Sequence, residues 1–230
     1  MAQKRISRAR KRDLEQPDEF LTLTSRLMGT INTYWKPISA GFSVLLVIIA
    51  ATLVYGYFRE RAETKSFTLL ELAMRHYQSE LARQDAAQAL DAVAPEFEDL
   101  LSNYGNYQGG KTGRLLYAQM QYQAGRIEAA ITQYVAAEKG FPEGSYALSA
   151  ARSGLGYAYA AAGRHEDAMA VFTRIVEGAE PVLKADALYQ LALLQRQTGR
   201  VAEYEKSLKA LQEEYPGFMY AEMLPAATGD

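Results

Sequence analysis

The pattern of hydrophobic and polar positions divides the chain into one long apolar run and a series of amphipathic segments. No charged residue occurs between Lys36 and Arg59, and these 22 residues, Pro37 to Phe58, have the apolar centre GFSVLLVIIAATLVYGYF. A helix rises about 1.5 Å per residue, so a helix of this length spans about 33 Å, enough to cross the hydrocarbon core of a bilayer. The run therefore predicts a transmembrane helix over residues 37–58.

The flanks of the run favour an uncleaved anchor over a cleaved signal peptide or a buried core helix. A cleaved signal has a short basic start, an apolar core of about 7–15 residues and small residues at the cleavage site. Here 36 residues precede the run, and Tyr55, Tyr57 and Phe58 lie where small residues would be needed. Tyr34 and Trp35 at the other end complete a pair of aromatic belts, as expected at two membrane interfaces.

Charge is distributed unevenly about the predicted span. Residues 1–36 contain eight basic and four acidic residues, a net charge of +4, whereas residues 37–230 contain 17 and 23, a net charge of −6. By the positive-inside rule the amino-terminal arm stays in the cytoplasm and the remainder is exported. We therefore expect a single-pass protein of a bacterial inner membrane with a periplasmic carboxyl-terminal domain. The arm, MAQKRISRARKR, is expected either to be a disordered topology signal or to contact anionic lipid, RNA or the ribosome surface.

Residues 19–35, between the basic arm and the span, allow two interpretations. Their apolar residues recur at helical spacing, so they form either an interfacial helix on the inner leaflet or a simple extension of the span. The residues on this face are Phe20, Leu23, Leu27, Ile31 and Tyr34.

Helical patterns continue after the span and indicate an all-α fold. No Gly or Pro occurs between Gly56 and Pro95, so we expect the transmembrane helix to continue into a stalk, with Asp85 capping the next helix. The expected parts are a cytoplasmic basic arm at 1–36, a transmembrane helix at 37–58, a helical stalk at 59–84, a repeat domain at 85–216, and a carboxyl-terminal cap and tail at 217–230. Apolar residues after Pro216 are suited to cap the domain or to join two chains.

Three segments after residue 112 repeat one another. Each carries Gly-Arg between two apolar helical stretches, with the glycines 38 and 36 residues apart, and glycine is the residue best able to end a helix in the left-handed conformation. In the first two segments a small residue follows five positions after the glycine and an aromatic residue four positions later. The residues concerned are Gly125, Ala130 and Tyr134, then Gly163, Ala168 and Phe172, and finally Gly199.

These residues resemble the signature of the tetratricopeptide repeat, which implies an α-solenoid of antiparallel helix pairs. The middle segment matches best, with Leu155, Gly156 and Tyr159 before the glycine. The first segment has Gln121 where an aromatic residue is expected, and the third has Tyr204 in place of the small residue. Residues 67–104 resemble a degenerate first unit without a turn glycine.

The whole layout resembles the YfgM-type ancillary subunits of the SecYEG translocon. A short cytoplasmic arm, one span, a helical stalk and a small repeat domain cover about residues 30–215. The resemblance implies an inner-membrane protein that contacts translocon subunits or a membrane-anchored periplasmic chaperone. The repeats by themselves do not exclude a scaffold in another envelope complex, for division or outer-membrane biogenesis.

Residues Gly105 to Thr112, GNYQGGKT, match the spacing of a phosphate-binding loop and would indicate a nucleotide-binding enzyme. That chemistry needs a buried strand before the loop, whereas EFEDLLSNY precedes it as an amphipathic helix. We therefore interpret the stretch as an inter-repeat loop. The chain has no Cys and only His76 and His165, so we expect no catalytic residue, metal, cofactor or small-molecule substrate.

The concave face of a repeat array is formed by the first helix of each pair, and it is the face where we expect a protein partner. Tyrosine recurs there once per unit and is favoured at interfaces. We expect that removing Tyr157 or reversing the charge of Arg196 weakens partner binding without unfolding the domain. The predicted groove residues are Leu115, Gln119, Tyr122, Ser153, Tyr157, Tyr189, Leu193 and Arg196.

Overall fold

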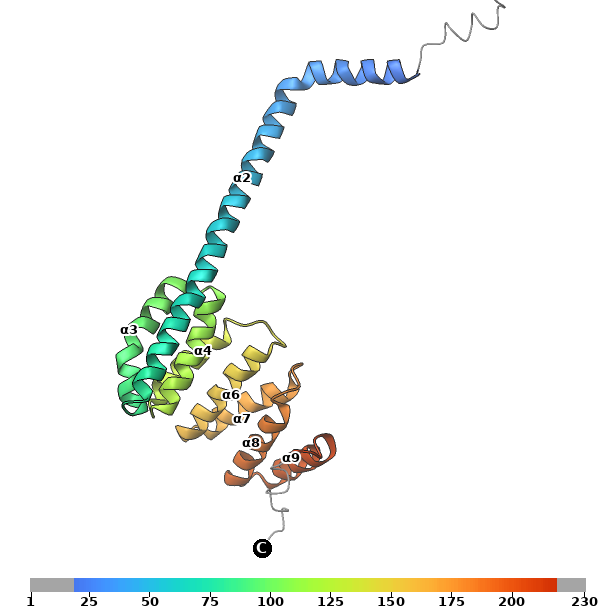
Figure 1. Ribbon diagram of the computed structural model, residues 1–230. Coiled ribbons are helices and arrows are strands. Elements are labelled where there is room, and N and C mark those ends of the chain that lie inside the picture. The colour runs from blue at the N-terminus through green and yellow to red at the C-terminus, as the bar shows by residue number, and fades with distance from the viewer. Residues whose placement is uncertain (1–18, 219–230) are drawn as a thin grey trace, which may run out of the picture. The chain divides into compact units, whose positions relative to one another are not determined.

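The computed structural model describes residues 19–218, without the side chains of residues 19–27, 29–33 and 38, and in that range every element is a helix. The basic arm and residues 219–230 lie outside the described residues. The helices in order are α2 (Glu19–Leu81), α3 (Ala86–Tyr104), α4 (Gln108–Gln123), α5 (Ile127–Glu138), α6 (Tyr146–Ala161), α7 (His165–Glu177), α8 (Lys184–Gln197) and α9 (Val201–Glu214) (Figure 1). They form two compact units, which meet between Arg59 and Glu60 within α2.

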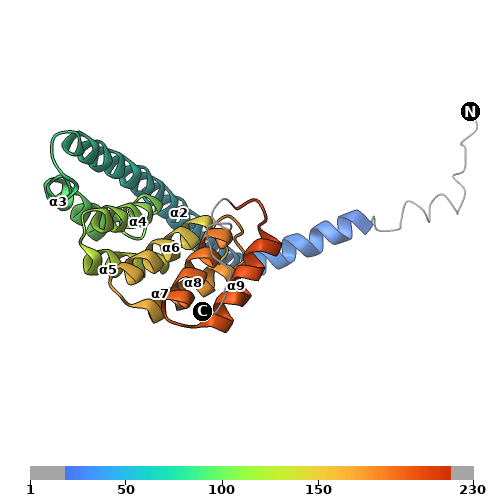
Figure 2. The same ribbon diagram turned by 90° about the horizontal axis from the view of Figure 1, so that it is seen from below.

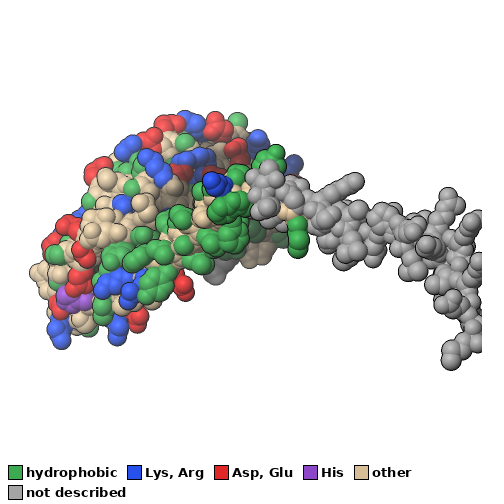
Figure 3. All heavy atoms as spheres, turned by 90° about the horizontal axis from the view of Figure 1, so that it is seen from above, with side chains coloured by type: hydrophobic (Ala, Val, Ile, Leu, Met, Phe, Trp, Pro, Cys, Tyr) green, Lys and Arg blue, Asp and Glu red, His purple; other side chains and the backbone are tan. Residues whose placement is uncertain are grey.

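The first unit contains the apolar part of α2. The helix is kinked at Tyr34, whose φ of −111° and ψ of 17° are not helical, and Pro37 shortly after it cannot donate a backbone hydrogen bond to the preceding turn. From Tyr34 onward the helix is long and apolar enough to cross a membrane. Its large hydrophobic side chains between Phe42 and Phe58 are exposed, and hydrophobic side chains form a green band in Figure 3. Whether residues 19–33 present an apolar face remains a prediction.

The second unit is a row of helix pairs. Each helix from α3 to α9 packs against its neighbours in sequence, and α4 also touches α6, so the pairs stack one after another (Figures 1 and 2). The predicted α-solenoid is therefore confirmed. Loops of different length join the pairs. The long connection 139–145 is held by Arg152, whose guanidinium bonds Glu138 at 2.9 Å and Glu143 at 2.7 Å.

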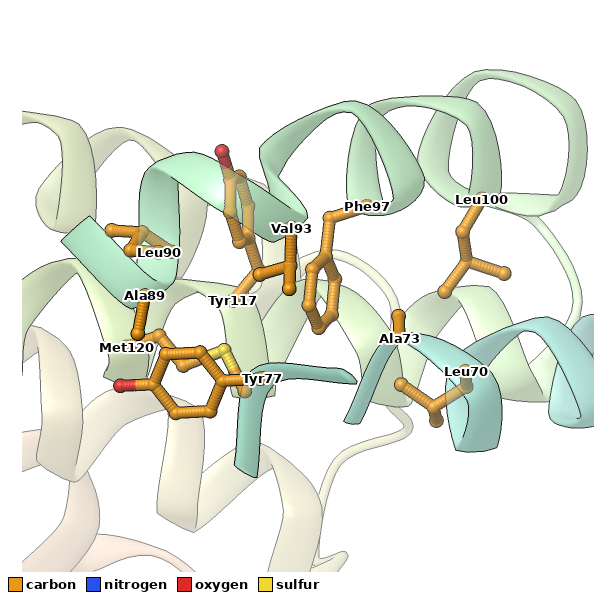
Figure 4. Packing of buried hydrophobic residues seen from close by; sticks show 10 residues of the cluster. All are labelled: Leu70, Ala73, Tyr77, Ala89, Leu90, Val93, Phe97, Leu100, Tyr117 and Met120. Carbon is orange, nitrogen blue, oxygen red and sulfur yellow. The ribbon is translucent and has the colours of Figure 1, made fainter. Parts of the chain in front are cut away.

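The end of α2 belongs to the packed core of the second unit. Tyr77 of α2, Phe97 of α3 and Tyr117 of α4 belong to one buried cluster (Figure 4), in which the rings of Phe97 and Tyr117 stack with centroids 4.9 Å apart. Leu70 and Ala73 of α2 are buried in the same cluster. The residues predicted as the second half of a stalk thus pack with α3 as a first helix pair, as the degenerate unit at 67–104 suggested. The exact domain limits remain a prediction.

The three turn glycines adopt the predicted left-handed conformation. The φ angles are 74° at Gly125, 73° at Gly163 and 74° at Gly199. In each turn the amide of the following arginine donates to a carbonyl five residues back, at 2.8–2.9 Å, which closes the end of the first helix of the pair. Only glycine adopts this conformation without a steric cost, so the Gly-Arg repeat marks the three hairpin turns.

The other signature residues form the contacts between helices. Ala130 and Ala168 are fully buried where the backbones approach. A Cβ atom on Gly154 would lie 2.3 Å from the ring of Tyr134, and one on Gly156 would lie 2.7 Å from the ring of Phe172. The two aromatic rings therefore pack directly on the backbone of α6. Leu155, which lies between the two glycines in sequence, is buried. Tyr159 is half-buried, and the guanidinium of an arginine lies over its ring.

The arginine after each turn glycine bonds an acid close by. Arg126 bonds Asp91 of α3 at 2.7 Å, and Arg200 bonds both carboxylate oxygens of Glu166 in the first turn of α7, at 2.5 and 2.6 Å. The middle one, Arg164, bonds an aspartate of its own helix at 2.8 Å. Two of the three turns are thus tied to the preceding unit by an ion pair.

Candidate functional site

A groove with a cavity of about 490 Å³ lies between α4, α6 and the start of α8. Helix α4 contributes Leu115, Gln119 and Tyr122, and α6 contributes Ser153 and Tyr157, all of which are predicted groove residues. The structure brings these five together on one surface. The remaining lining residues are Leu116, Gln123, Tyr134, Tyr146, Ala150, Gly154 and Leu183.

The groove is aromatic and carries no charge on any of its described lining residues. Four tyrosines, two glutamines and one serine supply hydrogen-bonding groups beside leucine and alanine. Burial, with the phenol of Tyr122 as a second cause, raises the pKa of Tyr134 to about 12, so its hydroxyl stays neutral at physiological pH. Such a surface offers apolar area and neutral hydrogen bonds, which suits an uncharged segment of a protein.

Tyr157 also has a structural role that the sequence did not reveal. Its hydroxyl donates to Asp186 Oδ2 of α8 at 2.8 Å, and its ring meets Phe172 edge-on with centroids 5.6 Å apart. Burial and the hydrogen bond to Asp186 raise the pKa of the Tyr157 hydroxyl. Because this side chain joins α6 to α8, its removal disturbs packing as well as the groove. That removing Tyr157 leaves the domain folded stays a prediction, and these contacts add a loss of stability to the expected result.

The three predicted residues of the third unit do not line this cavity. Tyr189 and Leu193 are half-buried against the core between α8 and α9, and the Tyr189 ring lies 5.9 Å from that of Phe218. Arg196 is exposed in the last turn of α8. The predicted eight-residue surface is thus divided into a groove on α4 and α6 and a separate patch on α8.

Sequence reasoning missed Tyr146 and Ala150 of α6. They lie 17 and 13 residues before Gly163, on the same helical face as Ser153 and Tyr157. Extending the count from the turn glycine by two further helical turns would have found both. Leu183, which precedes α8, comes from the connection between pairs and follows no such spacing.

Residues 105–112 do not form a phosphate-binding loop. Helix α4 begins at Gln108, so Gly109 to Thr112 are helical, and the interpretation of the whole stretch as an inter-repeat loop holds only for residues 105–107. The amide of Gln108 is already bonded to Glu63 at 2.8 Å. A Cβ atom on Gly109 would lie 2.4 Å from the hydroxyl of Ser66, so this glycine lets α4 approach α2 closely.

The described residues contain no group of three or more His, Asp or Glu side chains placed to hold a metal ion. His76 bonds Glu96 at 2.7 Å on the outside of the first helix pair. His165 begins α7, in a different pair. The two histidines therefore do not come together in one site.

Comparison with known proteins agrees with this architecture. The tetratricopeptide repeat family model matches residues 150–177 and 186–217. A tetratricopeptide repeat protein from Parabacteroides merdae aligns with a TM-score of 0.55 and 14% identity, over 68% of this chain and 57% of that chain. The protein MamA aligns with a TM-score of 0.53 and 17% identity, over 66% and 76% respectively. A putative kinesin light chain with repeats from Podosopora anserina aligns with a TM-score of 0.50 and 16% identity, over 71% and 79%.

These likenesses concern the fold, because all three identities are below 20%. The alignment spans little more than half the length of the Parabacteroides protein. No curated protein matches the chain. The helix pairs, the three left-handed turn glycines and the matched segments together show that the chain carries an α-solenoid of helix pairs similar to those of tetratricopeptide repeat proteins.

Proposed function

We propose that this protein is a membrane-anchored scaffold that binds a segment of a partner protein in the groove between α4 and α6. The uncharged, tyrosine-lined groove is the observation that carries the proposal. Its side chains supply apolar area and neutral hydrogen-bonding groups, and the hydroxyl of Tyr157 is already bonded to Asp186. In this proposal the protein acts by binding and not as an enzyme.

The apolar part of α2 supports the anchoring. Its large hydrophobic side chains are about half exposed or more, a contiguous surface that a water-soluble protein would normally cover. The charge difference across it favours a cytoplasmic arm and a periplasmic repeat domain. Tethering raises the effective concentration for a partner held in the same membrane, so a groove of modest affinity is sufficient.

The setting that we propose is protein export, by resemblance to the YfgM-type translocon subunits. Partners in that setting are subunits of the translocon or a membrane-anchored periplasmic chaperone. An assembly for division or for outer-membrane biogenesis is the alternative, because it would present the same compartment and the same tethering.

Site-specific photo-crosslinking in cells tests the groove and identifies the partner. Gln119 and Tyr146 are exposed residues of the groove, and each is replaced in turn by a photoreactive residue. Thr132, which is exposed on α5 outside the groove, is replaced in the matched control. We expect a defined adduct from positions 119 and 146 and none from 132. Equal adducts from all three positions, or lipid alone, would refute the groove. Mass spectrometry of the adduct decides between the export machinery and another envelope assembly.

The topology is tested separately. Protease added to spheroplasts should digest the repeat domain, and carbonate washing should leave the protein in the membrane fraction. Protection of the repeat domain or release by carbonate would contradict the anchored, exported arrangement.

Lys111→Ala tests the enzyme alternative. Lys111 lies in the first turn of α4. We expect the Lys111→Ala variant to function in cells as the wild-type protein does. Loss of function with a normal thermal unfolding midpoint would revive a role for Gly105–Thr112 in nucleotide binding.

A further inference from the structure

The described chain ends against α8, the helix that follows the groove residue Leu183. After α9, the amide of Phe218 donates to the carbonyl of Tyr215 at 2.9 Å, a turn that brings the chain back against α8. The Phe218 ring then packs on Tyr189 of α8, with centroids 5.9 Å apart. Leu183, immediately before α8, lines the groove. The described chain therefore ends beside Tyr189, six residues along the chain from the groove residue Leu183.

The segment that follows has the chemistry that the groove accepts. Residues 219–225 read MYAEMLP, with a single charge at Glu222. Methionine and leucine fill irregular apolar spaces, and tyrosine adds a hydroxyl that can bond the neutral polar groups of the lining. A strongly charged segment would have no counter-charge among the described lining residues.

Residues 219–225 are long enough to reach the groove. Tyr189 and Leu183 are six residues apart, which corresponds to about 9 Å along a helix. Seven extended residues span up to about 23 Å. Residues 219–225 are therefore long enough to pass along α8 and to enter the groove beside Tyr157.

We propose that residues 219–225 occupy the groove between α4 and α6 of their own chain. The segment covers the aromatic lining when no partner is bound, and a partner must displace it. The displacement rests on the function proposed above, whereas occupation of the groove by the segment stands without it.

The absence of cysteine makes a direct test simple. The full-length double variant Ser153→Cys with Met223→Cys is oxidised in detergent and run on a non-reducing gel. Thr132→Cys with Met223→Cys, which places the first thiol on α5 outside the groove, is the matched control. We expect the first pair to form a disulfide within one chain at least tenfold faster than the control pair. Equal rates would overturn the proposal. Disulfide-linked dimers from the first pair alone would also overturn it and would assign the groove to the segment of a second copy.

A peptide of residues 217–230 gives an independent measurement. Labelled at its amino terminus, it should bind the chain that lacks residues 219–230 more tightly than the full-length chain, by about tenfold if the groove is nine-tenths occupied. Gln119→Asp, at an exposed groove position, should weaken binding of the peptide, and Thr132→Asp should leave the binding unchanged. Equal binding to the truncated and full-length chains would contradict occupation.

The two proposals fail in different ways. If the disulfide forms but photo-crosslinks from position 119 in cells do not increase on truncation, the segment occupies the groove and the partner binds elsewhere. If crosslinks form but the disulfide rate equals the control rate, the partner uses the groove and the segment does not.

Discussion

Gly156→Ala tests whether the Phe172 ring packs directly on the backbone of α6. An added Cβ would lie 2.7, 2.8 and 2.9 Å from three atoms of that ring, closer than carbon atoms approach in folded proteins. The ring is fully buried and cannot move toward solvent. Overpacking of this kind costs about 1–3 kcal/mol, whereas Gly to Ala in a helix by itself gains up to about 1 kcal/mol.

We therefore expect Gly156→Ala to destabilise the protein by about 1–2 kcal/mol. In the background of Phe172→Leu, which removes the ring, the same change should become neutral or stabilising. The coupling free energy between the two positions should thus be about 1–3 kcal/mol, a range typical of residues in contact. A loss of about 1 kcal/mol corresponds to a fall in Tm of about 2–4 °C for a domain of this size.

Urea unfolding of the full-length protein in mild detergent, followed by far-ultraviolet circular dichroism, measures all four variants of this cycle. A Gly156→Ala protein at least as stable as the wild type would refute the packing argument. So would equal effects of Gly156→Ala in the two backgrounds, since the cost would then not depend on the ring.

Three other predictions concern the turns, the buried tyrosine and the ion pairs. Gly163→Ala, at a φ of 73°, should cost about 1–2 kcal/mol in thermal unfolding, whereas Gly217→Ala, outside the left-handed glycines, should be neutral. The folded chain keeps Tyr134 protonated to about pH 12 against an ordinary pKa of 10, so stability should fall as the pH rises from 10 toward 12, by about 2–3 kcal/mol in all. Urea midpoints at pH 8 to 11 should show a weaker dependence in Tyr134→Phe; an unchanged slope would contradict the assignment. Arg200→Gln removes the bond to Glu166 and should lower the midpoint at low salt but not at high salt; a loss independent of salt would point to packing instead.

The regular parts of the fold were predictable because single residues determine them. A glycine between two apolar helical stretches has few roles other than a left-handed turn, and Gly125, Gly163 and Gly199 all have that role. Ala130 and Ala168 followed from the same spacing and are both fully buried. The long apolar helix followed from composition alone.

The groove residues were predictable only where their spacing from the turn glycine is the same in successive units. Leu115, Gln119 and Tyr122 face Ser153 and Tyr157 because both sets keep the same distance from a turn glycine. The hydrogen bond from Tyr157 to Asp186 joins residues 29 apart in sequence, and no local pattern predicts it. The motif at Gly105–Thr112 was ambiguous for a related reason, since glycines serve close helix packing as readily as loops.

Two ion pairs at the turns connect a hairpin to the preceding helix pair, from Arg126 to Asp91 and from Arg200 to Glu166. The last pair, α8 and α9, therefore has a neighbour on one side alone within the described chain. In a linear array of this kind a terminal pair opens more readily than an inner pair, because it has fewer neighbours. Hydrogen exchange should accordingly be faster in α9 than in the inner helices α5 to α7, so that resistance to unfolding is graded along the row of pairs.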